Sequence, residues 1–396
     1  MQAPRLPPDL CFAIIDAVWA SADWRDTDRL ATLRACALTS TTWWRRARYQ
    51  LYRRVALADP SETLCRFVRT ITESPALGDL VKWLDLVVAH QLDDDADDPY
   101  EDRYWQEYEM ADEEVHGAAG GTTYPFHSIL HCLTSLERLC LQSKDSAEEL
   151  TWSYLFRFAS ITSLKHLAIH CFPFLSIKHL IQVLQNMPPL QSLSLRGLSW
   201  YDDDNRSPLE HGPTFGNKLE SLDLFLNMDD RPLIRLMPDT VQTLMLHPNM
   251  EHYGNAQPYV AHEGLNRYRS LTKMSLMVRL DEATDWVPEA LSRVRSSPLQ
   301  EVELRFWTLH SLFTTSRILE RVQAEKIHQV LSRDGSFSQL RTLRIKVDPA
   351  IVKPPESEDL VGAAHVLVNS IRACFASVSR GSGYRVVVLV KVMKKR

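Results

Sequence analysis

Apolar residues recur along this chain in one short pattern, with apolar side chains at positions i, i+3 and i+5 and mostly polar residues between them. The eight clearest copies are Leu136/Leu139/Leu141, Leu164/Leu167/Ile169, Leu190/Leu193/Leu195, Leu219/Leu222/Leu224, Val241/Leu244/Leu246, Leu271/Met274/Leu276, Leu299/Val302/Leu304 and Leu340/Leu343/Ile345. Counted from start to start, the steps between them are 28, 26, 29, 22, 30, 28 and 41 residues. A repeat with a period of this size is typical of a solenoid.

The spacing within each copy predicts a short strand. The last two apolar positions are two residues apart, so they lie on the same side of an extended segment. One repeat cannot bury so small an apolar edge alone, whereas stacked neighbours bury it as a continuous core. We therefore expect an α/β fold, with parallel strands inside and helices outside.

Three weaker copies extend the series, namely Tyr52/Val55/Leu57, Val81/Leu84/Leu86 and Tyr384/Val387/Leu389. The lettering L-x-x-L-x-L resembles that of leucine-rich-repeat proteins, and the resemblance covers about residues 50–396. The asparagine that regular families carry eight residues after the first leucine is present only as Asn227 and Asn249. The resemblance therefore implies an irregular leucine-rich-repeat solenoid.

The N-terminal segment, residues 6–52, predicts three short helices instead. Pro7 and Pro8 open the first helix, which has Asp9 in its first turn and ends near Trp19. The second and third helices are expected at residues 28–38 and 43–52. The first helix is apolar on two sides, and three short helices cannot bury both sides unaided. The surplus apolar face is expected to contact either the first repeat, as a cap, or another protein.

The lettering of this segment resembles an F-box, most of all that of the F-box-like proteins that fungi carry in large numbers. The resemblance lies in Leu6-Pro7-Pro8-Asp9-Leu10, Ile14-Ile15, the run LRACALTS at 33–40 and Trp43-Trp44-Arg45. It implies a unit that binds the Skp adaptor subunit of a cullin–RING ubiquitin ligase. The adaptor-binding positions that it implies are Leu6, Pro7, Leu10, Ile14, Ile15, Leu33, Cys36, Leu38 and Trp43. Residues 20–29 form a longer and more polar connection than compact F-boxes have.

We expect two domains, a helical one at residues 1–56 and a solenoid at residues 57–396 with an acidic insertion at about 90–123. Twelve carboxylates and the single Arg103 lie within that insertion. A block of like charges repels itself and stays solvated. It is interpreted either as an unconstrained insertion or as a docking loop for a basic partner. A calcium site is not favoured, because the spacing lacks the glycine and the terminal glutamate of an EF-hand loop.

Composition narrows the functional classes. The net charge of −5 does not favour a nucleic acid or an anionic membrane surface as partner. The seven scattered cysteines suit a reducing compartment. No apolar run reaches the ~18 residues of a membrane span, and the prolines and aspartates near the N-terminus argue against a signal peptide. We expect a cytoplasmic or nuclear protein.

The sequence offers little catalytic chemistry, with neither a glycine-rich phosphate loop nor a G-x-S-x-G motif. His127 and His131 have helical spacing beside Cys132, and His166 and His170 follow one repeat later. Convergence of these four histidines would be needed for a zinc site, and no H-E-x-x-H or C-x-x-C motif accompanies them. We expect no catalytic residue, no metal and no cofactor.

The partner-binding surface is predicted from the strand periodicity. Positions i+2, i+4 and i+6 of each copy point away from the buried leucines, and solenoids present such rows to partners. The predicted substrate-binding residues are His166, His170, Arg196, Phe225, Met245, Met277, Arg305 and Arg344. In the alternative interpretation, Glu303 and Arg344 simply pair across adjacent strands.

Three functions are in competition. One is an enzyme with a metal or hydrolase site on the solenoid, which would need the four histidines named above to converge. The other two are non-catalytic. The first is a non-catalytic substrate receptor of a Skp–cullin–F-box ubiquitin ligase, which binds the adaptor through its helices and a protein substrate through its repeats. The second is a leucine-rich-repeat scaffold without a ligase, in which the helices are only a cap. The two differ in whether the face carrying Leu6, Ile14, Ile15 and Trp43 is exposed or packed on the first repeat.

Overall fold

The computed structural model describes residues 7–20, 26–59, 61–88, 125–143, 155, 157–174, 176–187, 190–200, 218–226, 231–248, 265–279, 284, 286–295, 298–307, 315–332, 337–347, 360–378 and 384–390. Leu6 and the acidic insertion predicted at 90–123 lie outside these residues. The chain divides into two compact units. Unit 1 comprises residues 1–136 and 141–147, and unit 2 comprises residues 137–140 and 148–396.

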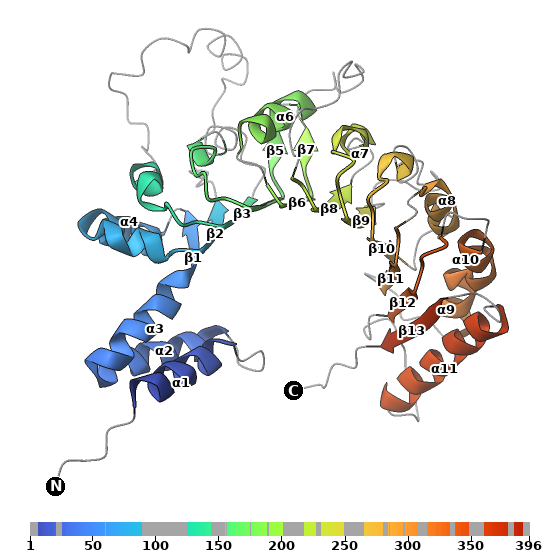
Figure 1. Ribbon diagram of the computed structural model, residues 1–396, viewed down its shortest axis with the longest axis horizontal. Helices are drawn as coiled ribbons and strands as arrows, with labels where there is room; N and C mark the ends of the chain where they lie inside the picture. Colours follow the sequence, from blue (N-terminus) through green and yellow to red (C-terminus); the bar gives the residue numbers. More distant parts are fainter. Residues whose placement is uncertain are drawn as a thin grey trace, which may run out of the picture. The chain divides into compact units, whose positions relative to one another are not determined.

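Unit 1 begins with three helices, α1 (Pro8–Ala20), α2 (Asp26–Thr39) and α3 (Thr41–Arg53) (Figure 1). Asp9 lies in the first turn of α1, where a carboxylate interacts favourably with the helix dipole. Ser40 is the extended N-cap of α3, and its hydroxyl accepts a hydrogen bond from the Trp43 amide at 3.4 Å. The three helices predicted from the sequence are confirmed, with ends that shift by at most two residues.

The three helices share a small core. Ile15 of α1, Leu33 and Cys36 of α2 and Ala47 of α3 are buried together. Half-buried side chains pack around this cluster, namely Val18, Trp19, Ala37, Trp43 and Leu51. Each helix therefore uses one stripe of apolar residues to pack against the other two.

The rest of unit 1 alternates strands and helices. Its elements are β1 (Arg54–Asp59), α4 (Glu62–Glu73), the 3-10 helix η1 (Pro75–Leu80), β2 (Trp83–Val88), the 3-10 helix η4 (Pro125–Cys132) and part of β3 (Arg138–Ser143). Ser61 caps α4 by accepting a hydrogen bond from the Leu64 amide at 3.1 Å. Strand β1 follows α3 directly and runs parallel to β2, so the predicted domain boundary after residue 56 falls inside β1.

Unit 2 is built on a parallel sheet. Beyond β3 its strands are β4 (His166–His170), β6 (Ser192–Arg196), β8 (Ser221–Leu226), β9 (Thr243–Pro248), β10 (Lys273–Arg279), β11 (Glu301–Trp307), β12 (Thr342–Val347) and β13 (Arg385–Val390). From β4 to β13 these strands pair in chain order, and each pair is parallel. Two short strands, β5 (Pro173–Phe174) and β7 (Ser199–Trp200), pair separately.

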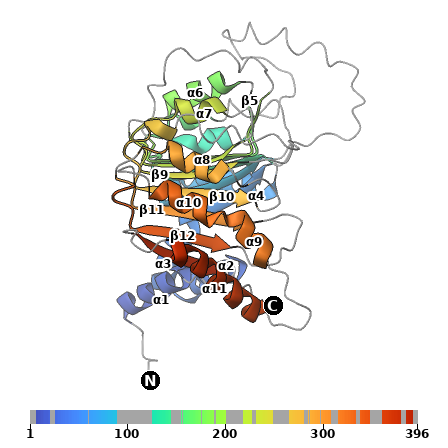
Figure 2. The same cartoon turned by 90° about the vertical axis from the view of Figure 1, so that its right-hand side faces the viewer.

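The helices of unit 2 lie on one face of this sheet (Figures 1 and 2). They are α6 (Ile177–Asn186), α7 (Arg231–Leu236), the 3-10 helix η8 (Leu265–Arg267), α8 (Trp286–Arg293), α9 (Thr315–Val322), α10 (Ala324–Leu331) and α11 (Leu360–Val378). The expected α/β class with parallel strands is confirmed. No helix in the described part of the chain is long and apolar enough to cross a membrane.

Local backbone geometry sets the ends of three helices in unit 2. Helix α6 begins at Ile177, because Phe174 belongs to β5 and Ser176 is the extended N-cap. Helices α9 and α10 follow each other closely in the chain. They are separated at Gln323, whose φ of 48° lies in the left-handed region.

The repeat pattern correctly predicts the buried face of the sheet. Every apolar position in the eight clear copies is at most 5% exposed. The strands are also in phase, so Leu193 of β6 pairs with Leu167 of β4 and Leu222 of β8. The leucines therefore stack in continuous rows beneath the helices.

The phase predicted for the last strand is wrong by one residue. Val387 and Leu389 were expected to point inward, yet Leu389 is 44% exposed while Val388 is 3% exposed. Val388 pairs with the buried Ile345 of β12. Residues 386–390 are all apolar, so the sequence lacks the alternation that would fix their phase, and a slip of one residue exchanges the two faces of a strand.

Candidate functional site

The adaptor-binding residues predicted in unit 1 fall into two groups. Ile15, Leu33 and Cys36 are buried in the three-helix core, and Trp43 packs against it. These residues hold the helices together, and the Trp43 side chain remains half-buried. The exposed group contains Pro7, Leu10, Ile14 and Leu38.

Two members of the exposed group, Leu10 and Ile14, contribute to an apolar surface on α1. Leu10 is 47% exposed and Ile14 is 37% exposed, and their spacing of four residues places them on one side of the helix. Ala17 is exposed one turn later. Leu38 near the end of α2 is 88% exposed, and Trp44 of α3, which the prediction did not include, is 43% exposed. This surface, Leu10, Ile14 and Ala17, is called the α1 surface below.

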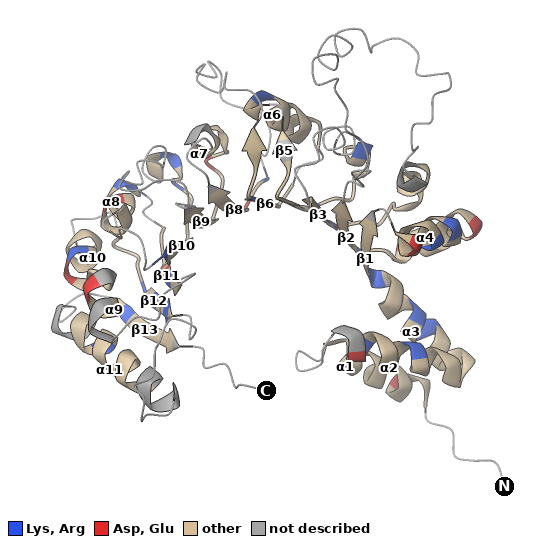
Figure 3. Ribbon diagram, turned by 180° about the vertical axis from the view of Figure 1, so that it is seen from behind, with Lys and Arg blue, Asp and Glu red and all other residues tan. Residues whose placement is uncertain are grey.

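Polar contacts fix the orientation of α1 on α3. Asp16 accepts hydrogen bonds from Arg46 Nε at 2.8 Å and from Gln50 Nε2 at 2.7 Å. The hydrogen bonds from Arg46 are the main cause that lowers the pKa of Asp16, while partial burial opposes it. The arginines of α3 appear as a series of blue segments in Figure 3. The α1 surface is therefore presented by a helix that is held both by the core and by a charged pair.

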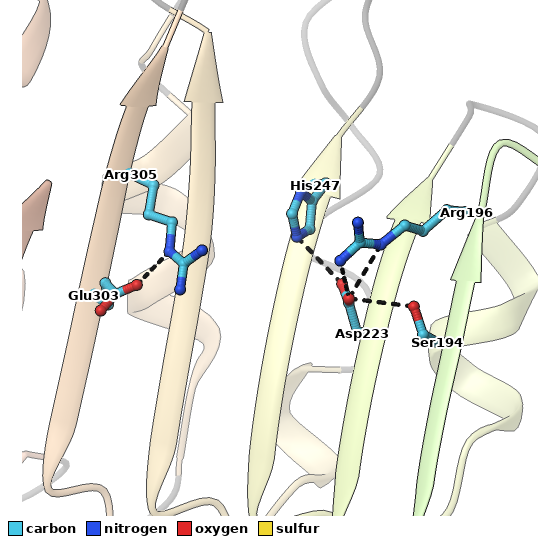
Figure 4. Close-up of polar contacts among 6 residues, drawn as sticks. All are labelled: Ser194, Arg196, Asp223, His247, Glu303 and Arg305. Carbon is cyan, nitrogen blue, oxygen red and sulfur yellow. Dashed lines mark hydrogen bonds and ion pairs between the residues drawn. The ribbon is translucent and has the colours of Figure 1, made fainter. Parts of the chain in front are cut away.

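In unit 2 the candidate surface is the outward face of the sheet, where two carboxylates organise the polar side chains (Figure 4). Asp223 of β8 accepts hydrogen bonds from Ser194 Oγ at 3.2 Å and from Arg196 Nε at 3.1 Å. His247 Nε2 of β9 lies 3.2 Å from Asp223 Oδ1. Phe225 stacks beside His247 with ring centroids 6.0 Å apart. Three neighbouring strands are thus joined through one carboxylate.

Opposing effects act on the pKa of Asp223. Burial raises this pKa, but the contacts with His247 and Arg196 together lower it by a larger amount. The pKa of Asp223 therefore lies below its ordinary value. The side chain is 18% exposed, so water compensates little for the loss of a partner. The ionised carboxylate therefore stabilises the folded chain above its unfolded-state pKa of about 3.9.

We expect Asp223→Asn to lower the free energy of unfolding by about 1–3 kcal/mol near neutral pH, because it removes the charge that Arg196 and His247 contact. The difference from the wild type should stay constant above pH ~4 and shrink as the pH falls through the lowered pKa of Asp223. Urea unfolding at a series of pH values measures this. A difference that grows on acidification would contradict the assignment.

The second carboxylate, Glu303 of β11, is completely buried although it lies on the outward face. Lys346 Nζ of β12 lies 2.9 Å from it, Arg344 Nη1 lies 3.7 Å from it, and Arg305 of its own strand donates a hydrogen bond to it. Burial raises the pKa of Glu303, and the contacts with Lys346 and Arg305 lower it by more. Glu301 contacts Lys273 at 3.2 Å and Arg344 at 3.5 Å. The predicted pairing of Glu303 with Arg344 is therefore present.

The predicted substrate-binding residues all lie on this face, in different surroundings. Arg196 and Phe225 join the Asp223 cluster, and Arg305 and Arg344 join the Glu303 cluster. The remaining four are His166 and His170 on β4, Met245 on β9 and Met277 on β10, and all four are half-buried.

The two histidines of β4 have different contacts. Burial, followed by the charges of Arg138 and Lys165, lowers the pKa of His166. His170 Nδ1 lies 3.9 Å from Cys140 Sγ.

The predicted substrate-binding residues omit Asp223 and His247, and the prediction named Glu303 only as a pairing partner of Arg344. Strand periodicity places all three on the outward face, but the sequence shows only that they face outward and not which neighbours they meet. The parallel register supplies that information. It aligns Ser194, Asp223 and Met245 in one row and Ser275, Glu303 and Arg344 in its continuation.

One hydroxyl, that of Ser194, lies in the Asp223 cluster. Ser194 contacts the carboxylate of Asp223 directly, so no histidine stands between them as a general base. Among the residues that the structure describes, no group of three or more His, Cys, Asp or Glu side chains could hold a metal ion. The side chain of His127, one of the four histidines considered above, lies outside that part.

Comparison of the chain with protein-family models and with curated proteins gave no match.

Proposed function

We propose that the chain is a substrate receptor of a Skp–cullin–F-box ubiquitin ligase, in which α1–α3 act as an F-box-like unit. The observation that carries this proposal is the α1 surface. Leu10 and Ile14 remain exposed although α1 belongs to a helical unit with a buried core of its own. An exposed apolar surface on a fixed helix is typical of a site for a protein partner.

In this proposal unit 2 is an irregular leucine-rich-repeat solenoid that holds a protein substrate. The in-phase parallel strands and the buried leucine rows support it, because each repeat buries its apolar edge only against its neighbours. The outward face of the sheet supplies the partner surface.

The receptor itself would perform no chemistry. Holding a substrate lysine near a ubiquitin-charged conjugating enzyme converts a bimolecular transfer into a nearly unimolecular one. The seven cysteines, all within the described residues, form no disulfide, which suits work in the reducing cytoplasm or nucleus.

A scaffold without a ligase is the second candidate. The continuity of α3 with β1 and its contacts with η1 favour it, because a cap on the first repeat would be attached in this way. The exposure of Leu10 and Ile14 favours the receptor instead, because a cap would cover its apolar residues.

Complex formation tests the proposal. The purified full-length chain and a purified Skp adaptor are mixed and separated by size-exclusion chromatography. The proposal expects them to elute together in a stable complex. Separate elution of the two folded proteins would contradict the receptor and leave the scaffold. A variant that lacks residues 1–56 is a poor control, because it has also lost half of β1.

A further inference from the structure

Cationic side chains gather on the outward face of strands β10 to β13. They are Lys273, Arg279, Arg305, Arg344, Lys346 and Arg385. The register places them on the same face, since Lys273 pairs with Glu301, Arg305 with Lys346, and Thr342 with Arg385. The same face of these strands carries two carboxylates, Glu301 and Glu303, so six positive charges minus two negative charges leave +4. This set is called the basic face.

The charges of the basic face lie at different depths. The Glu303 side chain is 0% exposed and that of Glu301 is 23% exposed, whereas those of Lys273, Arg305, Arg344 and Lys346 are 32–37% exposed. The carboxylates therefore lie beneath the cations. A ligand that approaches this face meets the positive charges first.

The spacing of the cations matches an extended peptide. Arg305 and Lys346 are register partners on adjacent strands, which lie about 4.8 Å apart. Arg344 lies two residues before Lys346, about 6.6 Å along the strand. Alternate side chains of an extended peptide also lie about 6.6–6.8 Å apart on one side. Carboxylates at every second position could therefore contact successive cations of the basic face.

Apolar groups border the cations. The Arg279 guanidinium lies 5.6 Å from the centroid of the Trp307 ring. Leu389 of β13 is 44% exposed, and it pairs in register with Lys346. A peptide held by its carboxylates would thus also find an aromatic and an aliphatic side chain, and burial of such groups contributes much of the affinity at protein interfaces.

We propose that the basic face binds an acidic peptide segment of a partner protein. This proposal deepens the proposed function by naming the class of ligand. It rests on the proposed function for one point only, which is that the partner protein is the ligase substrate. Binding at the basic face does not require the adaptor. A protein segment is favoured over a nucleic acid because alternate side chains of an extended peptide match the spacing of about 6.6 Å between cations along a strand, and because the chain as a whole carries a net charge of −5.

Fluorescence anisotropy tests the proposal with the full-length chain and a short labelled peptide in which glutamate alternates with serine. The control peptide carries glutamine in place of glutamate. We expect the glutamate peptide alone to bind, with an affinity that falls as salt is added. Arg305→Gln should weaken binding about tenfold, as the loss of a charged hydrogen bond does. Glu301→Gln should strengthen it about two- to fivefold by removing a repelling charge.

Arg293→Gln is the matched control, because it removes the same group from unit 2 but at a side chain 60% exposed on α8, outside the sheet. It should leave the affinity unchanged. If Arg305→Gln fails to fold, the Glu301→Gln variant decides whether the proposal holds. An increase in peptide affinity in that variant cannot result from unfolding. Equal binding of both peptides, no binding of either, or preferential binding of a single-stranded oligonucleotide would overturn the proposal. Each result is independent of adaptor binding, so failure here and failure of the ligase proposal are distinguishable.

Discussion

Replacing Ile15 with aspartate is expected to unfold the three N-terminal helices. Ile15 is 0% exposed and packs with Leu33, Cys36 and Ala47. The substitution removes a large apolar side chain from this core and places a carboxylate without a partner there. We expect a loss of at least about 4 kcal/mol, which a core of this size cannot tolerate. Hydrogen exchange should show the backbone amides within α1, α2 and α3 losing their protection.

The neighbouring residue supplies the control for this prediction. Ile14 is 37% exposed on the other side of α1, so Ile14→Asp should leave the same amides protected. The two variants, Ile14→Asp and Ile15→Asp, make the same chemical change at adjacent positions. Equal protection of the helices in both variants would contradict the placement of Ile15 in the core.

Truncation of Leu193 to alanine should destabilise unit 2 by about 2–5 kcal/mol. Leu193 is 1% exposed in β6, and its register partners Leu167 and Leu222 are buried on either side. Because both partners are held by their own strands, they cannot move far enough to fill the cavity. Equilibrium unfolding in urea measures the loss. The exposed Gln191, two residues earlier, provides a control, since Gln191→Ala should change the stability by less than about 0.5 kcal/mol.

A neutral result for Leu193→Ala would mean that the leucine rows do not form the core. The repeat interpretation of unit 2 depends on those rows. This measurement therefore tests the fold independently of any partner.

The sequence predicts the fold well wherever polar residues interrupt the apolar ones. In Leu164-Lys165-His166-Leu167-Ala168-Ile169 the alternation fixes which side chains are buried, and the structure buries Leu164, Leu167 and Ile169. In residues 386–390 every side chain is apolar, and the predicted phase is wrong by one residue. The polar positions are therefore as necessary as the leucines for predicting which side chains of a strand are buried.

Candidate sites are harder to predict, because they depend on neighbours in space. The resemblance to an F-box treats Ile14 and Ile15 alike, whereas the structure exposes the first and buries the second. The burial of Glu303 likewise requires cations from its own strand and from β12. Neither outcome follows from one-dimensional spacing, since each depends on how helices pack or on which residues a parallel register brings side by side.

Titration of the full-length chain with the Skp adaptor in a calorimeter tests the ligase proposal most directly, if wild type, Ile14→Asp and Val366→Asp are compared. Val366 is a matched control, because it is an apolar residue 53% exposed on α11 of unit 2. We expect wild type and Val366→Asp to bind equally and Ile14→Asp to lose at least about tenfold in affinity, since a charge would enter an apolar contact. Equal binding by all three variants, or no binding by folded wild type, would contradict the account.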